Sequence, residues 1–132
     1  MPEEVLSKKN YTIAIAEDNS VNMFFLKTLI EKYMPNVIIL EASDGDQIIN
    51  ILSQIKPDLL FLDLSLPLKD GIEIITYMKK QETLKEIPIA VITAMDSESV
   101  NKRLLNMGVN LYIKKPASKD VIYNALKTIF KI

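Results

Sequence analysis

The chain has 132 residues, of which 48% are hydrophobic and 25% charged, and its formal net charge is −1. This length suits one domain with its own core, and the near-neutral charge gives no general attraction to nucleic acids or membranes. Cysteine and histidine are both absent, which excludes disulfides, thiolate nucleophiles and imidazole bases or metal ligands. Any chemistry must therefore use carboxylates, hydroxyls or lysines.

Nothing in the sequence resembles a membrane anchor or a secretion signal. No apolar run approaches the roughly 18 residues that a membrane-spanning helix needs. The acidic start at residues 1–4 is also unlike a signal peptide. We therefore expect a cytoplasmic protein, with residues 1–10 as an N-terminal extension and residues 11–132 as one domain.

Five short apolar runs predict strands, and each is followed by a segment with helical spacing of apolar residues. The predicted strands are 11–16, 37–40, 59–62, 87–92 and 109–113. Asn19 or Ser20 is the expected cap of the first helix, which should end near Met34 because the following Pro35 disfavours further helix. The second helix opens at residues 43–46, and its expected inward residues are Ile48, Ile49, Leu52 and Ile55.

The remaining helices are predicted from similar signals. The third follows Asp70 and Gly71, and the fourth begins near Ser97. Gly108 is placed to end the fourth helix with a positive φ. Ser118 or Lys119 should open the last helix.

This alternation predicts a doubly wound α/β fold, a (βα)5 sandwich in which helices cover both faces of a parallel sheet. Right-handed crossovers favour the strand order 2-1-3-4-5 of flavodoxin-like proteins. The third predicted strand would then lie at the centre of the sheet.

Asp63 ends that central strand. Four consecutive apolar residues, 59–62, precede it, as is typical of a strand buried on both faces. Ligands of open α/β sheets bind at the carboxyl ends of the strands. We therefore predict that Asp63 is the reactive group.

Four more polar residues follow predicted strands and should meet Asp63 at the same edge: Glu17, Asp18, Thr93 and Lys115. Taken singly, each has an ordinary explanation as a helix-start charge, a strand-end hydroxyl or a solvated loop residue. Taken together, three carboxylates require a cation, and hard oxygen ligands suit Mg²⁺. The lysine and the hydroxyl leave room for a tetrahedral anion, towards which Asp63 could act as a nucleophile and form an acyl phosphate.

This set of residues resembles the receiver domain of response regulators in two-component phosphorelay signalling, over about residues 11–130. The markers are Ala16-Glu17-Asp18-Asn19, Leu62-Asp63-Leu64-Ser65-Leu66-Pro67, Asp70-Gly71, Ile92-Thr93-Ala94 and Lys115-Pro116. The opening Glu-Asp-Asn followed by Asn22 is most similar to receivers that belong to hybrid histidine kinases or work with them.

The resemblance implies a role for each marker. Asp63 would accept phosphate from a phosphohistidine of a histidine kinase or histidine phosphotransfer protein. Mg²⁺ would be bound by Asp18, Asp63 and the main-chain carbonyl of Ser65, with Glu17 acting through a water molecule. Glu17 stands where many relatives have Asp.

The same resemblance implies a conformational switch. Thr93 and Lys115 would each contact a phosphoryl oxygen, and the bond before Pro116 would be cis. The inward movement of Thr93 would make room for Tyr112, whose ring would report phosphorylation on the face formed by the fourth helix, fifth strand and fifth helix.

We do not expect an enzyme with a separate substrate, only a Mg²⁺-dependent phosphoacceptor with at most slow self-phosphatase activity. Ser65 and Met95 flank the expected path of the attacking water, and neither carries a carboxylate or amide to orient it. The sequence does not identify the cognate kinase or the downstream target, and it is compatible with a weak homodimer.

Other functions are less well supported. A haloacid-dehalogenase-like phosphatase would need an Asp at the position of Ser65, and a flavin-binding protein would need a phosphate loop where Glu17 and Asp18 stand. A degenerate receiver that serves only as a docking module is the main alternative. The run Met23-Phe24-Phe25 should expose at least one apolar side chain, either as ordinary surface or as part of a groove for a phosphotransfer helix.

Overall fold

The computed structural model describes residues 5–94 and 97–132, in which five strands alternate with five helices. The strands are β1 (Thr12–Ala16), β2 (Ile38–Ala42), β3 (Leu59–Asp63), β4 (Ile89–Thr93) and β5 (Leu111–Lys114). The helices are α1 (Ser20–Tyr33), α2 (Gly45–Leu52), α3 (Gly71–Lys79), α4 (Glu98–Asn106) and α5 (Lys119–Phe130). All strand pairs are parallel, in the order β2-β1-β3-β4-β5. The predicted doubly wound, flavodoxin-like fold is confirmed.

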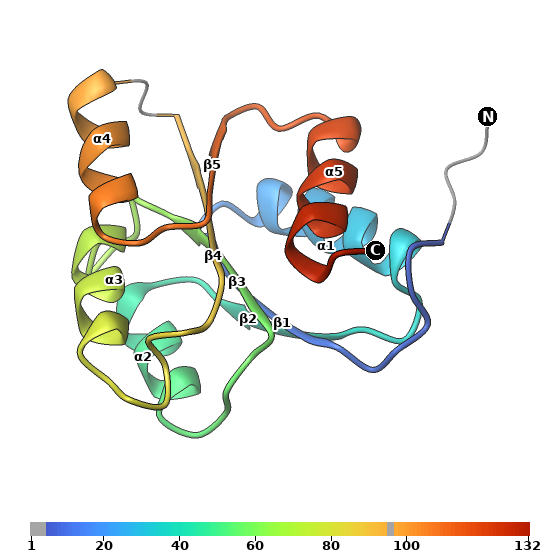
Figure 1. Ribbon diagram of the computed structural model, residues 1–132, viewed down its shortest axis with the longest axis horizontal. Helices are drawn as coiled ribbons and strands as arrows, with labels where there is room; N and C mark the ends of the chain where they lie inside the picture. Colours follow the sequence, from blue (N-terminus) through green and yellow to red (C-terminus); the bar gives the residue numbers. More distant parts are fainter. Residues whose placement is uncertain (1–4, 95–96) are drawn as a thin grey trace.

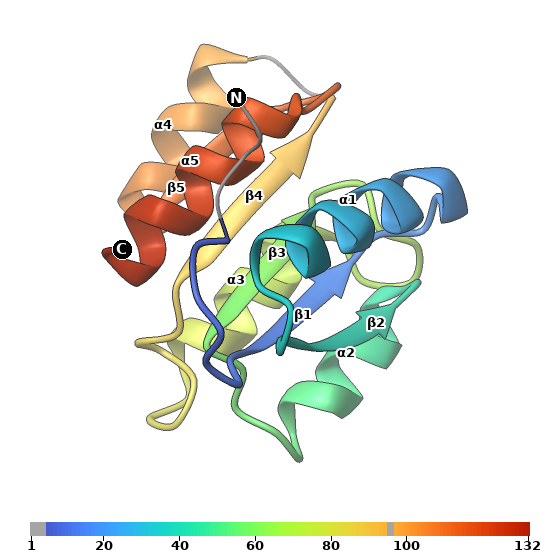
Figure 2. The same cartoon turned by 90° about the vertical axis from the view of Figure 1, so that its right-hand side faces the viewer.

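The sheet lies between two layers of helices. Helices α1 and α5 cover one face, and α2, α3 and α4 cover the other (Figure 1). The turned view in Figure 2 shows α1 and α5 side by side over the first of these faces. Each face has its own apolar core, so the fold holds two cores divided by the sheet.

The central strand β3 supplies both cores. All five of its residues are buried, and β1 and β4 flank it on either side. Leu60 and Leu62 pack in the core under α2, α3 and α4, whereas Leu59 and Phe61 pack in the core under α1 and α5. Side chains of a strand alternate between faces, which explains the uninterrupted apolar run. The last residue, Asp63, is thereby fixed at the carboxyl edge.

Short polar side chains define where every helix begins. Each helix has a cap residue whose side chain accepts a hydrogen bond from the main-chain N–H three residues later, which satisfies a donor that the helix itself leaves unpaired. These caps are Asn19, Asp44, Asp70, Ser97 and Ser118. The predicted starts of the first, fourth and fifth helices are therefore confirmed, as is the positive φ of Gly108, at 87°.

The structure corrects the predicted end of the second helix. Helix α2 ends at Leu52, and Ile55, which we expected to face inward, lies beyond it and is 45% exposed. The Ser53 hydroxyl donates a 2.6 Å hydrogen bond to the carbonyl of Asn50. This bond satisfies one of the carbonyl groups that the helix end leaves unpaired.

Strand boundaries also differ from those predicted. Strand β2 continues to Ala42, because its pairing with β1 extends to Ala16. Strand β5 begins at Leu111 and not at Val109. The side-chain carbonyl of Asn110 accepts a 3.0 Å bond from the Ile89 N–H, so it takes the place of a strand partner there.

Residues 5–10 precede the sheet without forming a helix or strand. Leu6 donates a main-chain hydrogen bond of 2.7 Å to Tyr33 at the end of α1 and packs against the core under α1 and α5. At the domain start, the ring of Tyr11 lies 4.2 Å from that of Phe130. The division at residue 11 stays a prediction. Within the described residues, no helix is long and apolar enough to cross a membrane.

Candidate phosphoacceptor site

The structure gathers the predicted site residues at the carboxyl edge of the sheet. Glu17 follows β1, Asp63 ends β3, Thr93 ends β4 and Lys115 follows β5. Glu17, Asp63 and Thr93 are 6%, 5% and 0% exposed, and they are the buried polar or charged side chains of the described residues. Polar groups are costly to bury without partners, so their contacts decide what this edge can do.

Lys115 links the two buried carboxylates. Its Nζ lies 2.7 Å from Oε1 of Glu17 and 2.9 Å from Oδ2 of Asp63. Its main-chain N–H donates a 2.8 Å bond to the carbonyl of Thr93, which fixes the lysine to the end of β4. The peptide bond between Lys115 and Pro116 is cis, as predicted. Sequence reasoning placed Lys115 at this edge but did not foresee the direct ion pair with Glu17.

The remaining carboxylate oxygens are held by main-chain groups. Oε2 of Glu17 accepts a 3.1 Å bond from the N–H of Asn19, the cap of α1. Oδ1 of Asp63 accepts a 3.0 Å bond from the N–H of Ser65. The two carboxylates are thus oriented by the loops that follow their own strands.

These contacts shift two pKa values. Burial raises the pKa of Glu17, and the charge of Asp63 adds to the rise, while hydrogen bonds from Lys115 and from the Asn19 N–H work against it. Burial also works against the charged form of Lys115. Its hydrogen bonds to Glu17 and Asp63 outweigh that effect and raise the pKa of the ammonium group above its ordinary value. Lys115 therefore stays cationic at neutral pH.

Asp18 completes a cluster of three acids. It is exposed, and one oxygen of each of Glu17, Asp18 and Asp63 can be chosen so that all three lie within 4.8 Å of one another. Such hard oxygen donors, open to solvent on one side, suit Mg²⁺, which retains several water ligands. The residues present therefore fit a divalent cation of this kind.

The loop after β3 is held in place from two sides. Gly71 donates a 2.9 Å main-chain bond to Leu64, and Gly45 at the start of α2 donates a 2.9 Å bond to Pro67. A Cβ on Gly45 would clash with the carbonyl oxygen of Lys69, so only glycine permits this approach. The loop that carries Ser65 therefore has a fixed path beside Asp63.

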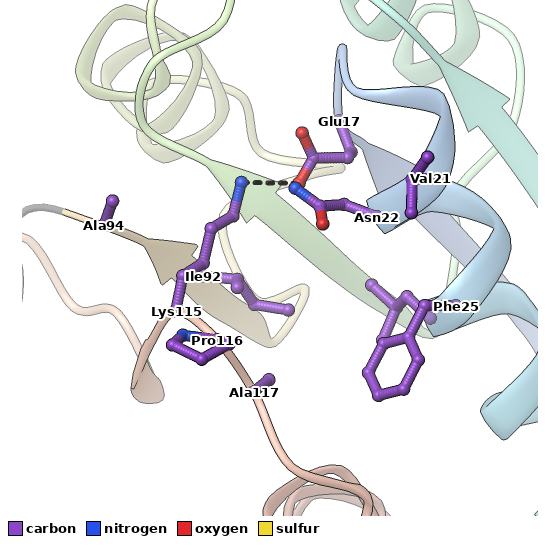
Figure 3. Close-up of a pocket in the computed structure, with 10 residues that line it drawn as sticks. Glu17, Val21, Asn22, Phe25, Ile92, Ala94, Lys115, Pro116 and Ala117 are labelled. Atoms are coloured by element: carbon purple, nitrogen blue, oxygen red, sulfur yellow. Dashed lines mark ion pairs between the residues drawn. The ribbon is translucent and has the colours of Figure 1, made fainter.

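A groove of about 590 Å³ adjoins the site, with α1 on one side and the segment after β5 on the other (Figure 3). Its lining comprises Glu17, Val21, Asn22, Phe25, Leu26, Ile92, Ala94, Lys115, Pro116 and Ala117. The ion pair between Glu17 and Lys115 crosses one end, and the rest is mostly apolar. Sequence reasoning anticipated exposed apolar residues on α1, and Phe24 and Phe25 are 71% and 44% exposed. It missed the opposite wall, because no sequence pattern shows that Pro116 and Ala117 lie across from α1.

Two predicted functional residues lie away from this groove or outside the described structure. Tyr112 is half-buried on β5, pairs with Val91 of β4 and packs against the core under α2, α3 and α4. It also lines a smaller groove beside α5. Met95 lies outside the described residues.

Comparison with known proteins assigns the family. The model of the response regulator receiver domain matches residues 13–127, and the chain therefore belongs to the response regulator receiver family. It is a receiver domain of two-component signalling, a class of phosphoacceptors that are generally not enzymes. The alternative of a docking module that works without phosphorylation is not favoured.

The relatives agree with this assignment. The polar-differentiation response regulator DivK of Brucella anthropi is 28% identical over 117 residues, which cover 89% of this chain and 94% of DivK. The phosphorylated cyanobacterial phytochrome response regulator RcpA has a TM-score of 0.81 and 28% identity over 93% of each chain. The Mn²⁺-bound form of the response regulator Rcp1 has a TM-score of 0.80 and 25% identity, over 91% of this chain and 94% of Rcp1.

Proposed function

We propose that Asp63 is the phosphoacceptor of this receiver domain. The observation that carries the proposal is the position of its carboxylate, buried at the end of the central strand and contacted by Lys115 at 2.9 Å. The ammonium group of Lys115 can stay with the site and pair with an oxygen of the incoming phosphoryl group. In RcpA, a relative of similar fold, the crystallised protein was phosphorylated.

The attack on phosphorus needs no base to activate the nucleophile, because a carboxylate has no proton to lose. An oxygen of Asp63 attacks phosphorus while the bond from phosphorus to the donor breaks on the opposite side, which yields an acyl phosphate. Lys115 balances negative charge on the phosphoryl oxygens. Thr93, which ends the neighbouring strand, would hydrogen-bond another of them.

We also propose that Mg²⁺ is held by Asp18, Asp63 and the main-chain carbonyl of Ser65, with Glu17 contributing through a water molecule. When bound, the ion would neutralise charge on the phosphoryl group during transfer. The acidic cluster supports this proposal. The related Rcp1 has been crystallised with Mn²⁺, another divalent ion that favours oxygen ligands.

Metal removal tests this assignment. With acetyl phosphate as donor, we expect covalent phosphate on the protein in Mg²⁺, detected by intact mass, and none in excess chelator. Asp18→Asn removes one ligand charge and should lower the apparent Mg²⁺ affinity at least about tenfold. Asp46→Asn is the matched control, because Asp46 pairs with Lys69 at 2.6 Å and lies outside the cluster. Equal labelling with and without the ion would contradict the proposal.

Receiver domains take phosphate from histidine kinases or phosphotransfer proteins, and we propose that such a donor approaches through the groove beside α1. Val21 and Phe25 are exposed and line this groove together with Glu17, and Phe24 is exposed on the same helix. A helix of the donor packed there would bring its phosphohistidine towards Asp63.

We propose that Thr93 and Tyr112 form the switch between the phosphorylated and free states. The chain contains no tryptophan, so Tyr112→Trp would introduce a single fluorescent reporter. We expect its emission to change on phosphorylation, because the ring moves between a more exposed and a more buried position. Adding Thr93→Ala should remove most of that change, while Tyr77→Trp on α3 serves as a reporter outside the switch. An undiminished change in the Thr93→Ala background would refute the coupling.

We further propose that the acyl phosphate is lost slowly. Ser65 is exposed and has no carboxylate or amide to orient an attacking water, and Met95 is apolar by its chemistry. Removing the donor by desalting, with Mg²⁺ kept in the buffer, would start the decay, which intact mass can follow. Met95→Glu should lose phosphate faster than the parent protein, since a carboxylate can orient water. Slower loss from the variant would count against the proposal.

A further inference from the structure

Asn22 lines the groove, and none of the functions proposed above involves its side chain. It lies in the first turn of α1, where its main-chain N–H donates a 2.9 Å bond to the side chain of Asn19. This bond fixes the residue at the helix start. Its carboxamide lines the groove, and in the described part of the chain no hydrogen bond holds that carboxamide. Figure 3 shows the side chain pointing to the end of the groove where Lys115 and Glu17 pair.

The groove is amphipathic along its length. Glu17, Asn22 and Lys115 form its polar end, and the other lining side chains are apolar. A flat ring with apolar faces and a phosphoryl group at its edge matches this distribution. A small acyl phosphate would occupy only the polar end and leave the apolar part unused.

We propose that Asn22 is a specificity-determining residue that hydrogen-bonds the imidazole leaving group of a phosphohistidine donor. This inference rests on the proposed function, since it assumes that Asp63 accepts the phosphate. A carboxamide is suited to the task because it offers both donor and acceptor atoms and carries no charge. A carboxylate in its place would repel the phosphoryl group.

The chemistry of the leaving group explains the selectivity. As the bond from phosphorus to the ring nitrogen breaks, its electron pair stays on that nitrogen while Asp63 bonds to phosphorus. The Nδ2–H of Asn22 can donate to this electron pair until the departing imidazole takes a proton from water. Acetate is a much weaker base than imidazole and gains less from such a donor. Asn22 should therefore favour nitrogen-linked phosphoryl donors over acyl phosphates.

The test compares two small donors, N-phosphorylimidazole and acetyl phosphate, on the full chain in saturating Mg²⁺, with intact mass as the readout. Asn22→Ala should slow transfer from N-phosphorylimidazole about fivefold, the value of one net hydrogen bond, and change transfer from acetyl phosphate less than twofold. Asn22→Gln retains the carboxamide and should recover part of the rate. Asn22→Asp should slow transfer from both donors, because its carboxylate would repel the phosphoryl group. Asn50 is an exposed asparagine on α2, and Asn50→Ala is the control for folding.

The other outcomes would contradict either the role of Asn22 or the proposed function. Equal slowing of both donors by Asn22→Ala, or no slowing of either, would overturn the role of Asn22 while leaving Asp63 as phosphoacceptor. An Asn22→Asp variant that behaves like the parent would show that this side chain does not face the donor, which also overturns it. Failure of the unaltered protein to gain phosphate from either donor would instead overturn the proposed function.

Discussion

Asp63→Asn should abolish covalent phosphorylation of the protein by acetyl phosphate in Mg²⁺. An amide nitrogen is not nucleophilic, and the neutral side chain also withdraws one of the three charges that would hold the ion. The fold should survive, because asparagine has nearly the same shape and can still accept the hydrogen bond from the Ser65 N–H. Intact mass spectrometry after incubation with the donor measures the result directly.

Asp120→Asn is the matched control for that experiment. Asp120 lies exposed in the first turn of α5 and is not part of the acidic cluster. The Asp120→Asn variant should gain phosphate at the rate of the unaltered protein. An equal mass gain in Asp63→Asn would mean that another side chain accepts the phosphate, and would refute the central assignment.

Lys115→Met should have two effects of opposite direction. The rate of phosphorylation should fall by about 10² or more, because a positioned cation no longer meets the charge on the phosphoryl oxygens. The affinity for Mg²⁺ should rise, because the ammonium group at 2.7 Å from Glu17 and 2.9 Å from Asp63 no longer competes for the same carboxylates.

The same substitution should also lower the stability of the metal-free protein. Two buried carboxylates lose their shared partner, and the free energy of unfolding should fall by about 1–3 kcal/mol, less than for a fully buried ion pair.

Lys114→Met provides the control for the loss of one lysine. Lys114 is the exposed neighbour at the end of β5, so its replacement should leave the phosphorylation rate and the Mg²⁺ affinity nearly unchanged. Calorimetric titration of the ion and intact mass measure the two effects separately. A Lys115→Met variant with weaker Mg²⁺ binding would contradict the competition between the lysine and the ion.

The sequence predicted the fold well because its strongest signals are local. Apolar runs, helix caps such as Asp70 and Ser118, and Gly108 each act within a few residues of themselves. Boundaries were less predictable, because they depend on partners far along the chain. The extension of β2 to Ala42 requires Ala16 opposite it, and the late start of β5 requires the bond between Asn110 and Ile89.

The sequence predicted which residues meet at the site, but not which of their atoms pair. Parallel strands place their carboxyl ends at one edge, so Glu17, Asp63 and Lys115 could be brought together from topology alone. Which oxygen pairs with which nitrogen depends on side-chain length and loop path. The reach of Glu17 to Lys115 and the groove wall at Pro116 therefore emerged only from the structure.

The ion pair of Lys115 with two carboxylates also sets a charge balance for the whole site. When ionised, Glu17, Asp18 and Asp63 carry three negative charges and Lys115 one positive charge, so the sum is 1 − 3 = −2. A single divalent ion brings this sum to zero, whereas a monovalent ion leaves one negative charge unbalanced. If this cluster binds the proposed cation, the number of charged side chains would therefore favour a divalent over a monovalent ion, before size or coordination geometry discriminates among divalent ions.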